Sequence, residues 1–118
     1  MKYGFGKMAI SYCIHYNKGK QRTEFLLKNH DYSDGNEYLA GIFQKEYGIR
    51  ILEKQDGIWF TILRLGKKRN DYEMVWHEDV GNYIYCAEQS CEANDRLQKM
   101  LQHVIDIANE QLTKTVST

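Results

Sequence analysis

The stretch Gly57–Leu65, which reads GIWFTILRL, decides the predicted fold of this chain. Read as a strand, it carries apolar side chains on both faces: Ile58, Phe60 and Ile62 on one, and Trp59, Leu63 and Leu65 on the other. A strand that is apolar on both faces is buried on both sides. We therefore expect this segment to lie in the centre of a β-sheet.

The segments around this stretch predict three more strands joined by short turns. Asp56-Gly57 is a hairpin signal, and the charged run 66–70 and the polar run 79–82 are typical turns. Parallel strands would need much longer crossovers, so the four strands should form an antiparallel meander. The three flanking strands are Ile49–Gln55, Tyr72–Glu78 and Tyr83–Ala87.

The first thirty residues predict a separate β-hairpin. Lys7–Tyr16 alternates and should bury the face that carries Met8, Ile10, Tyr12, Ile14 and Tyr16. A turn at 17–20, with Gly19 available for a positive φ, leads to a returning strand over Arg22–Lys28.

Two helices complete the predicted order. The first should be capped by Ser33 or Asp34 and end at Gly48, the second should run from Ser90 to Leu112, and Thr113–Thr118 should be a frayed tail. The order ββ-α-ββββ-α predicts a single two-layer α+β domain over residues 1–118, with helices packed on an antiparallel sheet of about six strands. A sheet face without helices would be left for a homodimer or a partner, so monomer and homodimer both remain open.

Composition narrows the functional class. No apolar run reaches the length of a membrane span, and the start of the chain lacks the pattern of a secretory signal, so we expect a cytoplasmic protein without membrane contact. The three cysteines, Cys13, Cys86 and Cys91, should be reduced thiols in that compartment. No residue pattern indicates a cofactor.

Charge is the most informative functional pattern, because a net charge of zero hides an uneven distribution. Residues 1–30 hold six Lys or Arg against one Glu, whereas residues 70–95 hold seven carboxylates and no Lys or Arg. Acids interleaved with aromatic side chains indicate a protein-binding surface for a basic partner. The predicted partner-binding residues are Asp71, Glu73, His77, Glu78, Asp79, Tyr83, Tyr85 and Glu88.

Two other functional readings remain open. The basic hairpin tip, with Lys18, Lys20 and Arg22 near Tyr12, Tyr16 and Phe25, could hold single-stranded nucleic acid. The histidines His15, His30, His77 and His103, or the pair Cys13 and His15, could serve a small hydrolase or nuclease. Cys86 and Cys91 match no common spacing of zinc ligands, so we expect no metal site. The favoured binding interpretation has no catalytic residue.

A small α+β domain with an acidic surface rich in Tyr and Trp resembles the bacterial immunity proteins of contact-dependent growth inhibition and related polymorphic toxin systems. The resemblance is one of size, architecture and surface character. It implies a non-catalytic protein that neutralises a cognate toxin domain, often a basic nuclease, by occluding its active site. No functional residue is carried over from the family by motif.

Overall fold

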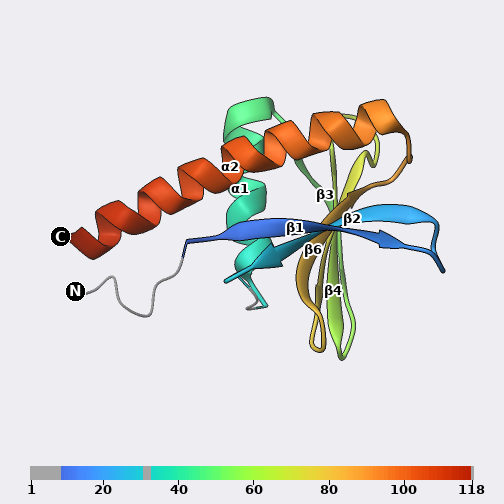
Figure 1. The fold of residues 1–118 in the computed structure, drawn as a ribbon, viewed down its shortest axis with the longest axis horizontal. Coiled ribbons are helices and arrows are strands. Elements are labelled where there is room, and N and C mark those ends of the chain that lie inside the picture. Colours follow the sequence, from blue (N-terminus) through green and yellow to red (C-terminus); the bar gives the residue numbers. More distant parts are fainter. Residues whose placement is uncertain (1–8, 31–32, 118) are drawn as a thin grey trace.

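A computed structural model describes residues 9–30 and 33–117. The predicted order ββ-α-ββββ-α is confirmed, and the protein has an α+β fold (Figure 1). No helix in these residues is both long and apolar enough to cross a membrane. The elements are β1 Ser11–Asn17, β2 Arg22–Lys28, α1 Gly35–Tyr47, β3 Arg50–Asp56, β4 Phe60–Gly66, β5 Tyr72–His77, β6 Gly81–Cys86 and α2 Cys91–Ser117.

The six strands form one antiparallel sheet in the order β1-β2-β6-β5-β4-β3. Strands β3 to β6 make the predicted meander, and the first hairpin joins it through β2, with Phe25 opposite Ile84 and Leu26 opposite Tyr83. The central position expected for the Gly57–Leu65 strand is wrong. Because the hairpin adds to β6, the centre of the sheet moves to β6 and β5, and β4 lies next to the β3 edge.

The hydrophobic core lies on one face of the sheet, where both helices pack. Strand residues such as Phe25, Leu63 and Ile84 join Leu39 of α1 and Leu101 of α2 in a single buried cluster. We call the opposite face of the sheet the open face, because no helix or strand of the described residues covers it. The side chains of β2, β6, β5 and β4 on this face are Arg22, Glu24, Leu26, Tyr83, Tyr85, Glu73, Val75, His77, Phe60, Ile62 and Arg64.

The first hairpin departs from its predicted burial. Ile14 and Tyr16 are each 55% exposed rather than buried, while Ile10 is buried. α2 reaches β1 near the start of the strand, where Gln98 donates to the Tyr12 hydroxyl at 3.1 Å, and the later part of β1 extends beyond that contact. The positive φ in the turn belongs to Gln21, at 52°, instead of Gly19. Lys7 and Met8 lie outside the described residues.

The helix ends follow local chemistry. Gly48 adopts the left-handed conformation at φ 71° and ends α1, as predicted, and Asp34 is its N-cap residue, although its side chain makes no capping hydrogen bond. The Ser90 hydroxyl accepts from the Ala93 N–H at 3.0 Å and so caps α2. α2 continues to Ser117, past the end at Leu112 that the sequence predicted for it.

The turn before β4 differs from the prediction in a way that matters for the surface. The Gly57 N–H donates to the Phe60 carbonyl at 2.7 Å, so Ile58 and Trp59 form the loop itself. A Cβ on Gly57 would lie 2.3 Å from the Phe60 ring, which explains the glycine at this position. Two large apolar side chains therefore leave the strand and project from its end.

Candidate protein-binding site

The structure distributes the eight predicted partner-binding residues over three places. His77 ends β5 and precedes Glu78 and Asp79 in the β5–β6 turn, while Asp71 and Glu88 lie near the opposite ends of the same strands. A six-residue strand is about 17 Å long, so these two groups do not share one surface. The residues on the open face between them are Glu73, Tyr83 and Tyr85.

Glu73 is already satisfied within the fold. Its carboxylate accepts from the Tyr85 hydroxyl and from the Asn70 side-chain amide at 2.8 Å, and it pairs with Arg64 at 3.5 Å. Asp71 has a similar partner in Arg69, also at 3.5 Å. The expectation that the acidic stretch lacks counter-charge is therefore wrong for these two acids, because β4 and the β4–β5 turn supply the arginines.

The tyrosines on the open face belong to the same network. The Arg22 guanidinium lies 3.7 Å from the centroid of the Tyr85 ring, and its Nε donates to Glu24 at 2.7 Å. Tyr83 stacks on Tyr85, with 6.2 Å between the ring centroids. Burial, together with the hydrogen bond to Glu73, raises the pKa of Tyr85 far above its ordinary value. Tyr83 and Tyr85 therefore make their contacts within the open face of the sheet. They are poor candidates for side chains that bind a partner.

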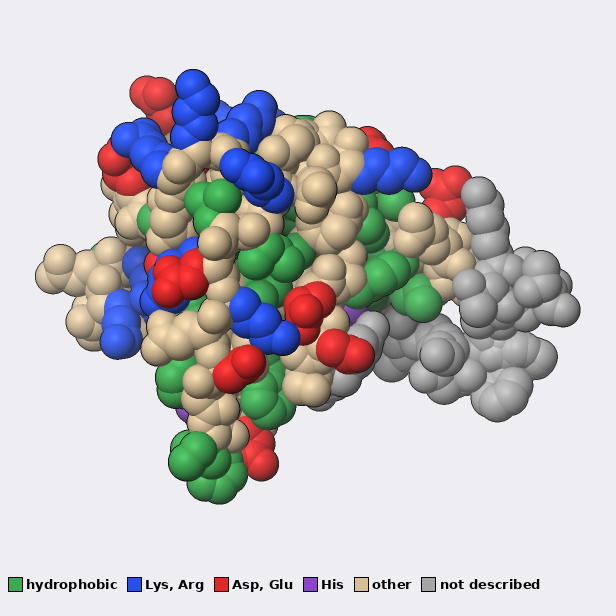
Figure 2. Space-filling model, turned by 180° about the vertical axis from the view of Figure 1, so that it is seen from behind, with side chains coloured by type: hydrophobic (Ala, Val, Ile, Leu, Met, Phe, Trp, Pro, Cys, Tyr) green, Lys and Arg blue, Asp and Glu red, His purple; other side chains and the backbone are tan. Residues whose placement is uncertain are grey.

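The strongest site lies at the end of the sheet where the β3–β4 and β5–β6 turns meet. Ile58 is 84% exposed, Trp59 59% and Val80 58%, and Figure 2 shows apolar side chains gathered at the lower tip of the molecule beside an acidic one. Exposed clusters of this kind mark interaction sites. We call it the hairpin-tip surface and define it by Asp56, Ile58, Trp59, Glu78, Asp79 and Val80.

Backbone hydrogen bonds order the two turns against each other. The Glu78 N–H donates to the Trp59 carbonyl at 2.9 Å, which ties one hairpin to its neighbour. Within the second turn, the Asp79 N–H donates to Nδ1 of His77 at 3.1 Å. The apolar side chains are thus presented on a bonded double turn, which lowers the ordering cost of binding.

The charge at this tip is acidic. Glu78 and Asp79 are exposed and form no ion pair with any described residue, and Asp56 accepts from the Thr61 hydroxyl at 3.0 Å. Neither 55–63 nor 70–95 contains a Lys or Arg. The hairpin-tip surface therefore combines exposed apolar anchors with the two carboxylates of Glu78 and Asp79, which have no ion-pair partner among the described residues, and this pattern suits a basic partner.

Two of the three aromatic side chains predicted to bind single-stranded nucleic acid pack within the fold. Phe25 lies in the core, and Tyr12 packs edge-on against it, with 5.8 Å between the ring centroids. Arg22 points onto Tyr85 instead of joining Lys18 and Lys20. Of the three aromatic side chains predicted for this surface, Tyr16 alone is exposed, at 55%, close in sequence to the turn that carries Lys18 and Lys20.

The histidines lie on separate parts of the fold. His30 is buried, with Nε2 2.8 Å from the Gly35 carbonyl, and His103 on α2 lies 3.0 Å from Glu46. His15 is exposed on β1, and His77 lies at the tip. Within the described residues, no three potential metal-binding side chains come together.

The three thiols should differ sharply in reactivity. Cys13 and Cys91 are exposed, whereas burial raises the pKa of Cys86 to about 11. We expect a thiol reagent at pH 8 to modify Cys13 and Cys91 and to leave Cys86 untouched until the protein unfolds. Since the folded thiol binds its proton more tightly than an exposed thiol of pKa 9.0, its contribution to stability is complete below pH 9 and is lost towards pH 11. Mass spectrometry of the labelled protein shows which of the three thiols have reacted. Rapid labelling of folded Cys86 at pH 8 would contradict the expected difference in reactivity.

Sequence reasoning missed Ile58, Trp59 and Val80 as surface residues. The first two were assigned to the core because they continue an apolar strand without a break. A usable signal was present, since Gly57 can pair with Phe60 across a two-residue loop. Val80 stands between Asp79 and Gly81 in a turn, where an apolar side chain has no core to enter.

Comparison of the chain with models of protein families, with curated proteins and with solved structures finds no match.

Proposed function

We propose that this domain is a non-catalytic binding protein that engages a basic partner protein through the hairpin-tip surface. The observation that carries the proposal is the pair of joined turns that exposes Ile58, Trp59 and Val80 beside Glu78 and Asp79. Apolar anchors of this size supply most of the binding free energy at an interface, and the acids around them steer a cationic partner into place.

The shape of the tip favours a concave target. Two hairpins project together from one end of the sheet, at the bottom of Figure 1, and carry the apolar side chains at their ends. A narrow, acidic projection with an apolar end suits a basic cleft, such as the active site of an enzyme that binds nucleic acid. We therefore propose, as the finer statement, that the domain acts in the cytoplasm and neutralises a basic toxin domain by occluding its active site.

The test uses, as the candidate toxin, the C-terminal domain of the protein that the gene immediately upstream of this one encodes. We expect the purified domain to bind the wild-type protein and to lose its activity on binding. Trp59→Ala should weaken the affinity about 30-fold, which corresponds to the roughly 2 kcal/mol of an interface hot spot. Leu52→Ala, which truncates an exposed apolar side chain on β3, is the matched control and should bind as the wild type does. Isothermal titration calorimetry measures both.

The charges are tested on the same pair of proteins. Reversing Glu78 and Asp79 to Lys should slow association, with the larger effect at low salt, because exposed charges are screened as ionic strength rises. Glu88→Lys, at the other end of the strands, should leave the association rate close to that of the wild type. Equal affinities for Trp59→Ala and the wild type would rule out the tip as the binding surface. A bound toxin domain that keeps its activity would rule out the neutralising role.

A further inference from the structure

The two edges of the sheet differ in how they are protected. β3 carries four charged side chains in seven residues, and its register shifts between Ile51 and Glu53. β1 carries no Asp, Glu, Lys or Arg at all, and Ile14 and Tyr16 are exposed. Charged side chains and bulges prevent edge strands from pairing with other chains. The β3 edge has these devices, and the β1 edge lacks them.

A side chain of α2 shows which backbone groups of β1 point outward. The Asn109 amide accepts from the Ile10 N–H at 2.8 Å and donates to the Ile10 carbonyl at 3.0 Å, so these backbone groups point away from β2. Backbone groups alternate along an extended strand, so those of Tyr12, Ile14 and Tyr16 point the same way. Within the described residues, no hydrogen bond is made to the outward backbone groups of these three residues.

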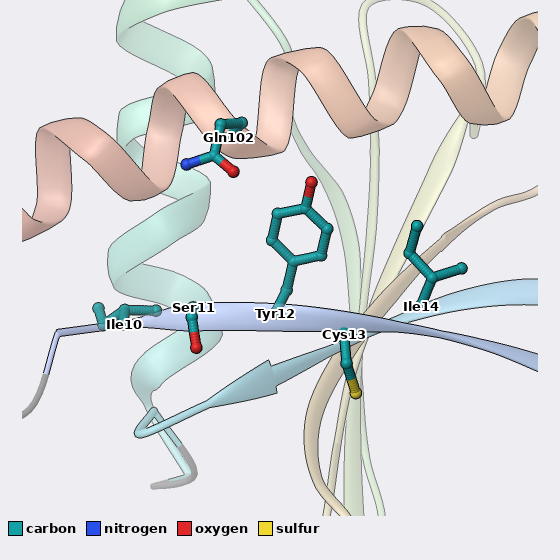
Figure 3. A pocket seen from close by; sticks show the side chains of 6 residues that line it. All are labelled: Ile10, Ser11, Tyr12, Cys13, Ile14 and Gln102. Atoms are coloured by element: carbon teal, nitrogen blue, oxygen red, sulfur yellow. The ribbon is translucent and has the colours of Figure 1, made fainter.

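A groove runs beside this edge, between β1 and α2. Its two parts measure about 480 and 360 Å³ and share Tyr12 and Gln102. Figure 3 shows Tyr12 and Ile14 pointing from β1 to the side on which α2 lies, and Cys13 pointing the opposite way. An extended strand placed along β1 would thus find backbone partners at the edge and space for its side chains against α2.

We propose that β1 pairs antiparallel with β1 of a second copy of this chain, centred on Ile14, to form one continuous sheet through a twofold axis. The length of open edge sets this register. Asn109 occupies the edge at Ile10 and the turn begins after Asn17, so the open groups run from Tyr12 to Tyr16, with Ile14 at the midpoint.

The sequence Tyr12-Cys13-Ile14-His15-Tyr16 is self-complementary in this register. Ile14 faces the partner's Ile14, and Tyr12 faces the partner's Tyr16, so each pair exchanges two backbone hydrogen bonds and packs apolar side chains. On the opposite side of the sheet, Cys13 faces the partner's His15. Across the twofold axis, no charged side chain faces another of the same sign. An isologous interface needs a surface that is complementary to itself, and this strand meets that condition.

A disulfide trap tests the register. In a background in which Cys13 and Cys91 are changed to Ser, Ile14→Cys places two thiols across the twofold axis, at a Cα separation of about 5.5 Å that a disulfide can span. We expect oxidation to yield a covalent dimer of Ile14→Cys. Tyr16→Cys is the matched control, because its thiol faces the partner's Tyr12, and it should stay monomeric on a non-reducing gel. Dimers from Tyr16→Cys but not from Ile14→Cys would overturn this register.

Sedimentation equilibrium under reducing conditions tests the interface itself. The wild type should be a concentration-dependent dimer, and Ile14→Lys, which sets two ammonium groups against each other at the axis, should be monomeric. Ile51→Lys, on the β3 edge, should remain dimeric. A wild type that is monomeric at every concentration overturns the proposal, and so does a dimer that Ile51→Lys dissociates and Ile14→Lys does not. Ile14→Lys does not change the hairpin-tip surface. This variant should therefore bind the toxin domain as the wild type does, which distinguishes the dimer proposal from the proposed function.

Discussion

Replacing Arg22 with methionine is expected to lower the free energy of unfolding by about 3 kcal/mol. The Glu24 side chain is 6% exposed, and the Arg22 Nε lies 2.7 Å from its carboxylate. Removing the guanidinium leaves a buried carboxylate whose remaining hydrogen bond among the described residues comes from the Asn17 amide, at 3.2 Å. Urea unfolding followed by circular dichroism measures the change.

Two companion variants test whether the burial of the Arg22–Glu24 ion pair is the reason for this loss of stability. Arg69→Met removes an arginine whose side chain is 83% exposed from its pair with Asp71, and should change stability by less than about 0.5 kcal/mol. The double variant Arg22→Met/Glu24→Leu should recover most of the loss, because an apolar pair of similar volume can replace a buried ion pair. If Arg22→Met alone unfolded at the urea concentration of the wild type, the buried pair would not be the stabilising feature described here.

A methyl group on Gly66 should destabilise the fold by a comparable amount. The Cβ of Gly66→Ala would lie 1.7 Å from the Arg69 carbonyl oxygen, which belongs to the backbone of the β4–β5 turn and cannot rotate away. The turn would have to open, and with it the hydrogen bond from the Asp71 N–H to the Leu65 carbonyl at 2.8 Å. We expect a loss of about 3 kcal/mol, at the upper end of common point-mutation effects.

The same substitution in α1 is the matched control. Gly41 lies in the helix interior, and a Cβ there would meet no atom within 4 Å. Gly41→Ala should therefore stabilise the protein by about 0.5–1 kcal/mol, because alanine loses less backbone entropy in a helix. Thermal unfolding of the two variants compares them directly. A stable Gly66→Ala protein would mean that the turn tolerates a wider path than the one observed.

Local patterns were enough to predict most elements. The alternation in 72–78, the apolar stripe of α2 and the helix stop at Gly48 are set by residues close in sequence, and the structure confirms all three. The strand order could not be predicted, because the pairing of Phe25 with Ile84 depends on contacts between distant segments. Ile58 and Trp59 were misplaced for a related reason: an apolar residue in a turn has the same local pattern as one in a buried strand.

The candidate site was predictable only in part. Charge pattern correctly selected Glu78 and Asp79 as exposed acids, but it grouped them with Asp71 and Glu88, which the strands carry to the other end. The charge pattern along the chain also predicts an unpaired Glu73. That prediction is wrong, because Arg64 reaches Glu73 only once β4 pairs with β5. Composition along the chain thus indicates which charges exist, and the sheet decides which of them meet.

The junction between β2 and β6 has a consequence for how the protein is made. Its ladder contains only Phe25–Ile84 and Leu26–Tyr83, whereas the first hairpin pairs along all seven residues of each strand. During synthesis the first hairpin must wait until residues near 84 have left the ribosome before it gains its neighbour. A nascent chain stalled before that point would expose Phe25 and Leu27 to solvent and become a client for chaperones.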